Sequence, residues 1–413
     1  MGFLLFGAMI NHCYANPPKL SRTNAALLDP PHPFAYTRGY SHHHRMSPGA
    51  PAAFFRAPPD GRRRMKHPST IRRPLPGVLR AFPLLLAILV LGSCLSREAR
   101  LNRAWKDNPS FRIGYWGAGW KTRPLALRTA AAPSELVEKI RIENRIQGFD
   151  ERPEAAPPLA EVTAALASLE ASLPGPVRDL LEERLVGVFC VRELGGTGYA
   201  DVVYDREGSE RFGLVVLDVD VLREQTANRW ATWKEQSIFR PPGVGDPVVR
   251  VRIEEPEDDT TENAVRFILL HELGHVLGMV SRAHPSWVDW QSGKPVSLEQ
   301  PFVRLSWRSG GEDGFHSRFD GAFPQRTAVR AYGFDRSEIP AGRIPETYRN
   351  LTRHTDFPTL PAAQSPWEDF AESFATYVHV VLDGRPRVVT VWEGGNPVLS
   401  RSPCWGSARC AAK

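Results

Sequence analysis

The spacing of apolar and polar residues predicts a small sheet in the middle of the chain. Runs rich in β-branched residues at 185–191, 199–204 and 212–222 are separated by the segments GGTG and DREGSE, which are typical of turns. We therefore expect these runs to form a small antiparallel sheet. At 248–254 apolar residues alternate with arginines, as in a strand with one solvated face.

Helices are predicted around these strands. Residues 159–172 are rich in Ala, Leu and Glu, and 174–185 has Pro176 near its first turn. A tryptophan-containing helix is expected at 224–236. Strands clustered in one region and long helices elsewhere favour an α+β fold over a parallel α/β fold.

The most apolar predicted helix contains the sequence FILLHELGHVLGMVSRAH at 267–284. Asp259 and Glu262 have the spacing of a capping box, with the threonines between them as alternative N-caps. Gly278 is expected to end the helix. Because apolar residues surround the motif, we expect this helix to be buried.

The same helix contains the motif HExxH. His271 and His275 are four residues apart, so both imidazoles lie on one face of the helix and can bind one metal ion. Glu272 is close enough to accept a proton from water at that ion. Two imidazoles and a carboxylate would be costly to bury without partners, and a metal ion removes that cost. The motif predicts one zinc ion per chain, with Glu272 as general base.

A catalytic zinc site needs a third protein ligand. The extended motif HExxHxxGxxH is disfavoured, because its last position is Ser281. An HExxH helix followed by a second, acidic helix resembles the gluzincin metallopeptidases. The sequence EDFAESF, within 366–382, is similar to the ligand helix of thermolysin-type enzymes and of the catalytic domain of anthrax lethal factor. The resemblance covers about 40 of the 413 residues.

This resemblance implies a zincin-like α+β domain that hydrolyses peptide bonds. Carried over position by position, it places the third zinc ligand at Glu368. It places at Glu372 the carboxylate that orients a liganding imidazole. Asp369, next to Glu368, is the competing ligand. Such enzymes also stabilise the oxyanion with a side chain such as tyrosine. Tyr348 and Tyr377 are candidates, a structural role is the alternative for each, and the oxyanion residue stays unassigned.

The first part of the chain has a different composition. Residues 1–64 are rich in Pro, Ala, Arg and His without an apolar period, so no fold is predicted. We expect translation to start at Met65. Residues 65–93 combine a basic segment with an apolar run of about 11 residues, short of the roughly 20 that span a bilayer. LGSC at 91–94 resembles the lipobox of bacterial lipoproteins, which implies a cleaved signal peptide over 65–93 and lipidation of Cys94.

The mature chain would then begin at Cys94. Residues 94–135 are expected to form a tether and lead-in, and residues 136–413 the zinc metallopeptidase-like domain. Residues 1–93 contain 12 basic and 2 acidic residues, so removing them changes the net charge from +6 to −4. We therefore expect no nucleic-acid partner. The expected partners are a peptide or protein substrate and a membrane of the bacterial cell envelope, with the domain facing the periplasm or exterior.

Three further cysteines follow Cys94. In an oxidising compartment Cys404 and Cys410 could form a small disulfide loop and leave Cys190 as a buried thiol; three free thiols are the alternative. Residues 276–367, rich in Trp, Arg, Gly and Pro, are either a substrate-facing loop region or a separate subdomain. The alternative function is a non-catalytic, zinc-stabilised surface lipoprotein that binds a partner through this region.

Overall fold

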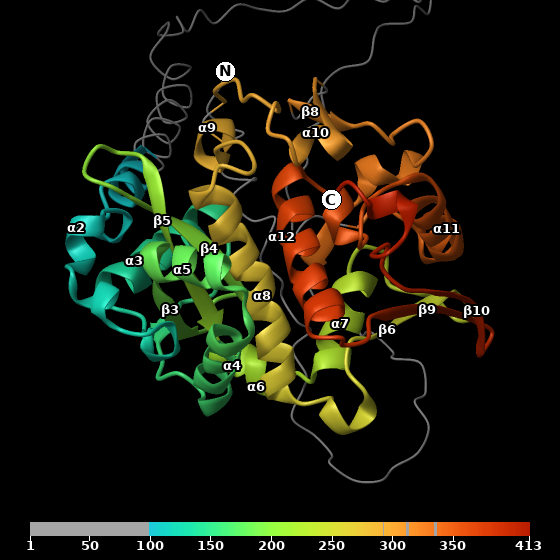
Figure 1. Ribbon diagram of the computed structural model, residues 1–413, viewed down its shortest axis with the longest axis horizontal. Coiled ribbons are helices and arrows are strands. Elements are labelled where there is room, and N and C mark those ends of the chain that lie inside the picture. The colour runs from blue at the N-terminus through green and yellow to red at the C-terminus, as the bar shows by residue number, and fades with distance from the viewer. Residues whose placement is uncertain (1–98, 292, 311–313, 334–336) are drawn as a thin grey trace, which may run out of the picture. The chain divides into compact units, whose positions relative to one another are not determined.

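The computed structural model in Figure 1 describes residues 99–413 except 292, 311–313 and 334–336. The longer helices are α3 Ser134–Gln147, α4 Ala160–Ser172, α5 Gly175–Arg184, α7 Ala227–Gln236, α8 Thr261–Val280, α11 Ile344–His354 and α12 Pro366–Tyr377. Short helices are α2 Ile113–Trp116, α6 Val219–Arg223, α9 Trp287–Gln291 and α10 Val303–Ser306. The strands are β1 Thr129–Ala131, β2 Glu154–Ala155, β3 Leu185–Arg192, β4 Gly198–Tyr204, β5 Glu210–Asp218, β6 Val248–Arg252, β7 Trp307–Ser309, β8 Phe315–Ser317, β9 Val388–Glu393 and β10 Asn396–Arg401.

The largest sheet has the strand order β1-β3-β5-β4, with β2 beside β3. Strands β1, β3 and β5 are parallel, and β4 is antiparallel to β5 at the edge. The expected antiparallel sheet is therefore wrong in one respect: β3 pairs with β5 rather than with β4. The physical reason is that nearly every residue of β3 and β5 is buried, and strands covered on both faces fit the centre of a sheet with parallel pairs.

Helix α8 packs on this sheet and is buried on nearly all sides. Strand β5 approaches it closely at Gly213, where an added Cβ would lie 2.9 Å from Cγ1 of Val276. Each large apolar side chain buried in this way stabilises the fold by roughly 1.5–3 kcal/mol. The sheet thus forms a rigid support for α8, the helix that carries the HExxH motif.

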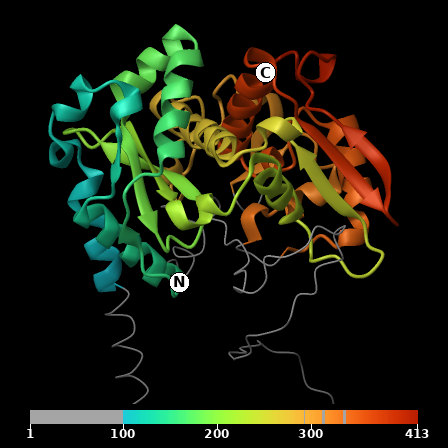
Figure 2. The ribbon, with the colours of Figure 1, turned by 90° about the horizontal axis from the view of Figure 1, so that it is seen from below.

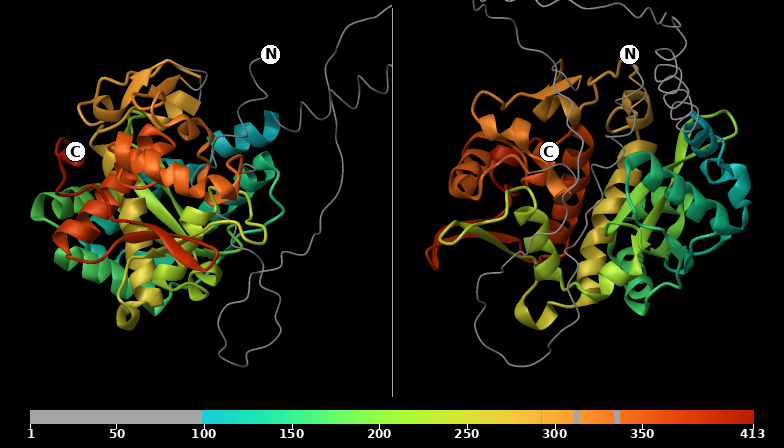
Figure 3. Two further views of the ribbon diagram at one scale, coloured as in Figure 1. Left: turned by 90° about the vertical axis from the view of Figure 1, so that its right-hand side faces the viewer. Right: turned by 180° about the vertical axis from the view of Figure 1, so that it is seen from behind.

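A second group of elements lies on the other side of α8. Helix α12 runs along α8, as Figure 1 and the rear view in Figure 3 show. Strands β10, β9 and β6 form a separate antiparallel sheet, and α7 packs beside β6. Seen from below, the large sheet and this smaller sheet lie on opposite sides of the α8–α12 pair (Figure 2). The described part of the chain is therefore a mixed α+β domain with small sheets, as predicted.

The tryptophan-rich segment 276–367 is folded in its described part. It contains α9, α10, α11 and the β7–β8 pair. Its aromatic rings gather around Trp367 at the start of α12, with ring centroids at 4.8 Å for Trp290 and 5.7 Å for Phe315. This packing ties the segment to the helix that carries Glu368.

The segment expected to be a tether and lead-in contributes to the domain from Trp105 onward. Phe111 and Trp120 are buried, and β1 pairs with β3. The indole of Trp105 donates a hydrogen bond to Glu143 of α3 at 2.7 Å. In this part the expected lead-in belongs to the folded domain, because its aromatic residues and β1 complete the core and the sheet.

The start of α8 agrees with one of the alternative N-caps in the sequence, whereas its end differs from the one expected. Thr260 is the N-cap, and its hydroxyl accepts from the backbone N–H of Asn263 at 3.2 Å. Asp259 instead accepts from the N–H of Asn228. The helix continues past Gly278 to Val280, so Gly278 does not end it. The glycine is needed for packing, since an added Cβ would lie 2.4 Å from Nε2 of His284.

The predicted disulfide is confirmed: Cys404 and Cys410 are bonded, with Cα atoms 5.5 Å apart. Cys190 is a buried thiol, and burial raises its pKa to about 12. The extension 1–64, the signal peptide 65–93 and Cys94 lie outside the described residues. In the part that the structure describes, no helix has both the length and the apolar character needed to cross a membrane.

Candidate metal centre

Helix α8 presents the two motif histidines to α12. His271 and His275 are one turn apart, and they are 2% and 5% exposed. Their Nε2 atoms lie 3.2 Å from each other. The regular helix, capped by Thr260 and packed on the sheet, fixes this spacing.

Helix α12 brings Glu368 to the same place. Ser365 caps the helix by accepting from the N–H of Glu368 at 3.2 Å, and Pro366 follows at its first turn. Oε2 of Glu368 lies 3.6 Å from Nε2 of His271, and Oε1 lies 3.5 Å from Nε2 of His275. The candidate ligand atoms of the three residues all lie within 4.8 Å of one another, so this buried group could hold a metal ion.

Gly274 permits the two helices to approach this closely. It lies between the histidines, and an added Cβ would be 2.9 Å from Cα and 3.1 Å from the carbonyl oxygen of Ala371. Both contacts are with backbone, which cannot rotate away. A glycine inside an apolar helix was a signal of close helix packing that the sequence analysis did not use.

Glu272 is buried next to these residues. It is 4% exposed, and its Oε2 atom has no hydrogen-bond partner in the described part of the chain. Burial raises the pKa of Glu272, partly offset by the neighbouring His271 and His275. A buried carboxylate oxygen without a donor is costly, so this oxygen is suited to a group that the protein itself does not supply.

Glu372 lies one turn after Glu368, and its Oε1 atom is 2.7 Å from Nδ1 of His271. The carboxylate also accepts from Nζ of Lys234 and, at 2.7 Å, from the hydroxyl of Thr359. Burial acts to raise the pKa of Glu372, but Lys234 and His271 hold it well below its ordinary value. The carboxylate of Glu372 thus orients the imidazole of His271, with Nδ1 toward Glu372 and Nε2 toward Glu368, as the resemblance implies.

Tyr332 is the site residue that the sequence analysis missed. Its hydroxyl lies 3.3 Å from Nε2 of His271. Its backbone has a positive φ of 70°, which is uncommon for a non-glycine residue and is often found at functional sites. The N–H of Tyr332 donates to Ser237 at the end of α7, and the preceding N–H donates to Gln364. These bonds hold the phenol at the centre.

The expected tyrosines do not reach the centre. The Tyr348 hydroxyl donates to Glu235 at 2.7 Å, in a buried network with Arg387. Tyr377 is 44% exposed and packs edge-on against Trp405. Neither candidate therefore lies at the centre, and both side chains take the structural alternative by contacting other parts of the domain.

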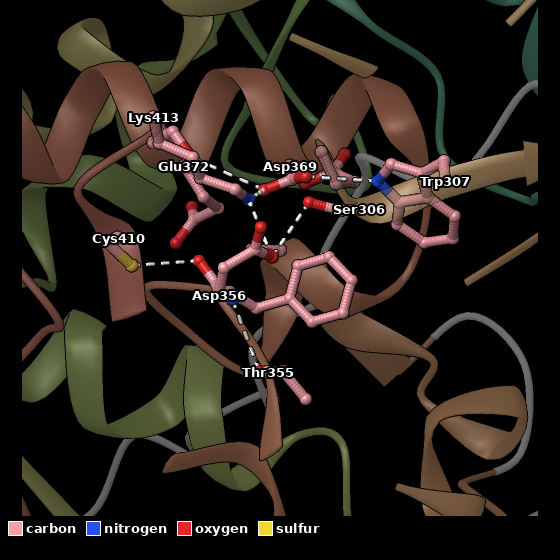
Figure 4. A network of polar contacts seen from close by, with 12 residues as sticks. Ser306, Trp307, Thr355, Asp356, Asp369, Glu372, Cys410 and Lys413 are labelled. Carbon is pink, nitrogen blue, oxygen red and sulfur yellow. Dashed lines mark hydrogen bonds and ion pairs between the residues drawn. The ribbon is translucent and has the colours of Figure 1, made fainter. Parts of the chain in front are cut away.

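The competing ligand Asp369 points away from the histidines. Figure 4 shows its carboxylate between Trp307 and Lys413. It accepts from the Trp307 indole at 3.0 Å and from Nζ of Lys413 at 2.5 Å. Lys413 also lies 3.4 Å from Asp356. Adjacent residues on a helix point about 100° apart, so only one of Glu368 and Asp369 can face α8.

Two other buried histidines are held in place by backbone carbonyls. His379 donates from Nε2 to the carbonyl of Ile253 at 2.8 Å, with Pro386 at 3.1 Å. His284 donates from Nδ1 to the carbonyl of Pro285 at 3.0 Å. Burial lowers the pKa of each imidazole to about 4. Neither residue belongs to the metal-holding group.

A pocket opens beside His275. Its lining includes Ala200 and Val202 of β4, Met279 and Trp287. Residues 199–202 of β4, the last strand of its sheet, contribute to this lining. The centre therefore adjoins a mainly apolar cavity that β4 helps to line.

Comparison with known proteins adds no relative, since no protein-family model, no curated protein and no solved structure matches this chain.

Proposed function

We propose that the chain is a zinc-dependent metallopeptidase of the gluzincin type with a zincin-like fold. The observation that carries the proposal is that His271, His275 and Glu368 meet in one buried place. Glu272 and Tyr332 lie beside them. Three of these side chains could hold the metal ion, and Glu272 and Tyr332 each have a separate use in metal-assisted peptide hydrolysis.

The donor set fits zinc in both chemistry and spacing. Two imidazoles and a carboxylate suit zinc, and three protein ligands with an open fourth position are typical of catalytic sites. Tetrahedral bonds of about 2.0–2.2 Å place the ligand atoms roughly 3.3–3.6 Å from one another. The pairs formed by His271, His275 and Glu368 are 3.2, 3.5 and 3.6 Å apart.

A zinc ion would supply a Lewis acid for the scissile carbonyl and would make water more acidic. Glu272 would accept the proton of the attacking water and pass it to the leaving amine. The Tyr332 hydroxyl would donate a hydrogen bond to the carbonyl oxygen as negative charge develops there. Glu372 would keep the Nε2 atom of His271 directed at the metal position.

Two features support catalysis over the alternative of a non-catalytic zinc-stabilised binding protein. A purely structural zinc site is normally closed by four protein ligands, whereas this group offers three. Glu272, with its unpartnered buried oxygen, has no use in a structural site and costs stability.

The pocket beside His275 supports a peptide or protein as substrate. An extended peptide can pair with an exposed strand edge, while neighbouring pockets receive alternate side chains. Strand β4 borders the pocket next to His275. A bound peptide that paired with β4 would lie with its backbone extended in the pocket that His275 also lines.

We also propose an extracytoplasmic location in the bacterial cell envelope. The lipobox-like LGSC at 91–94 supports a signal peptide over 65–93 and a lipid anchor at Cys94. Mass spectrometry of the native N-terminus should find a lipidated Cys94. Peptides recovered from residues 1–64 would contradict the start at Met65.

The role of Glu272 gives the direct test of catalysis. Glu272→Gln should lower cleavage of a peptide library by about 10²–10⁴-fold while zinc content stays at the wild-type level. Glu262→Gln, at an exposed position near the start of the same helix, is the matched control. Undiminished cleavage by Glu272→Gln would contradict the role. Full zinc content in a wild-type protein that cleaves nothing would favour the non-catalytic alternative.

A further inference from the structure

A buried lysine stands behind the metal centre. Lys234 projects from α7 and is 3% exposed. Its ammonium contacts Oε1 of Glu372, a residue 138 positions later in the chain. It also lies over the rings of Trp230 and Tyr332, at 5.1 and 5.4 Å from their centroids. Lysine is rarely buried without a specific partner, and here the partner is the carboxylate that faces His271.

The contact involves one particular oxygen atom. Oε1 of Glu372 meets both Nζ of Lys234 and Nδ1 of His271, whereas Oε2 accepts from the neutral hydroxyl of Thr359. Without the ammonium, Oε1 would lose its cationic partner and keep the contact with His271, so the carboxylate would be held less firmly and could turn more freely. Lys234 therefore fixes the oxygen that orients the ligand.

Charge balance points to the same residue. Glu272, Glu368 and Glu372 place three carboxylates at a buried centre, and Lys234 is the ammonium that contacts one of them. With a divalent ion bound, these charges sum to zero. Removing the ammonium would leave a buried net negative charge, which is costly away from water.

We propose that Lys234 is a positioning residue of the metal centre, which strengthens metal binding by holding Oε1 of Glu372 against Nδ1 of His271. The inference rests on the proposed zinc site. It assigns a function to a residue that touches neither the metal position nor the motif histidines. Its effect on the metal has to pass through Glu372.

Zinc affinity, measured by competition with a chromophoric chelator, tests the inference without requiring a substrate. Lys234→Met keeps the length of the side chain and removes its charge, and we expect zinc binding at least about tenfold weaker than in wild type. Lys139→Met is the matched control. Lys139 is similarly buried and pairs with Glu143 and Asp201, which line the pocket beside His275 but do not belong to the metal-holding group. Lys139→Met should lower the free energy of unfolding and leave zinc affinity unchanged.

A double-mutant cycle separates positioning from general destabilisation. If Lys234 acts through Glu372, the variant with both Lys234→Met and Glu372→Gln should bind zinc about as Glu372→Gln alone does. Lys234→Gln replaces Lys234→Met in the cycle if the methionine variant does not fold.

The possible results separate a failure of the role proposed for Lys234 from a failure of the proposed zinc site. Wild-type zinc affinity in Lys234→Met, or losses that multiply in the double variant, would overturn the role of Lys234. In either case the zinc site itself would stand. A wild-type protein that binds no zinc would overturn the proposed function.

Discussion

Replacing Gly274 by alanine should weaken metal binding without touching a ligand. The added Cβ would lie 2.9 Å from Cα of Ala371, whereas carbon atoms in contact prefer about 3.5–4.0 Å. Helices α8 and α12 must therefore separate by about 0.6 Å or more. Metal–ligand distances tolerate only about 0.2 Å, so Glu368 would no longer reach the metal together with the histidines.

The size of the expected loss of zinc affinity depends on whether the metal-free or the zinc-bound protein contains the clash. Forcing an extra methyl group into a packed interface costs about 1–3 kcal/mol. The metal-free protein can avoid this cost by letting the helices separate, but zinc binding draws them together and restores the clash. Zinc affinity should therefore fall about 5- to 150-fold, at roughly 1.4 kcal/mol per factor of ten.

Chelator competition and urea unfolding of the metal-free protein measure the two effects separately. Gly114→Ala in α2 is the control, because an added Cβ there meets nothing within 4 Å. An unchanged zinc affinity in Gly274→Ala would refute the reasoning. So would a gain in stability of about 1 kcal/mol, which an unhindered glycine-to-alanine change in a helix gives.

Three further predictions concern residues outside the ligand set. Tyr332→Phe should lower kcat about 10²–10³-fold with full zinc content, measured on a cleaved peptide; an unchanged kcat would exclude it as oxyanion donor. His379 has its pKa lowered by burial to about 4, so the fold favours its neutral form. The contribution of neutral His379 to the free energy of unfolding is complete above about pH 6.5. It is lost as the pH falls towards 4, where the free energy of unfolding is lower by up to about 3 kcal/mol. His379→Phe should remove that part of the pH dependence of urea unfolding, and an identical pH profile would contradict it. Cys404→Ser with Cys410→Ser should lower the free energy of unfolding by about 2 kcal/mol, because the bond closes a short loop; no change in the urea midpoint would count against this.

The local signals in the sequence were sufficient to locate the two helices of the centre. The HExxH spacing placed both histidines on one face, and Pro366 with an acidic first turn marked the second helix. These features depend on the helical repeat and on capping, which act over a few residues. The resemblance to gluzincins then indicated Glu368 and Glu372, which the structure brings to His271.

What could not be predicted depends on contacts between distant segments. The order of β3, β4 and β5 is set by packing of both sheet faces, which apolar runs alone do not reveal. Tyr332 lies in a turn 61 residues after His271, and nothing in its local sequence marks its direction. Lys234 sits in a helix with charged neighbours, where a lysine is expected to face water.

Metal content tests the central claim most directly. Elemental mass spectrometry should find one zinc ion per chain in the purified wild-type protein and in the control Glu262→Ala, and little or none in Glu368→Ala. A wild-type protein without zinc would contradict the metallopeptidase proposal. Full zinc content in Glu368→Ala would contradict the assignment of Glu368 as the third ligand.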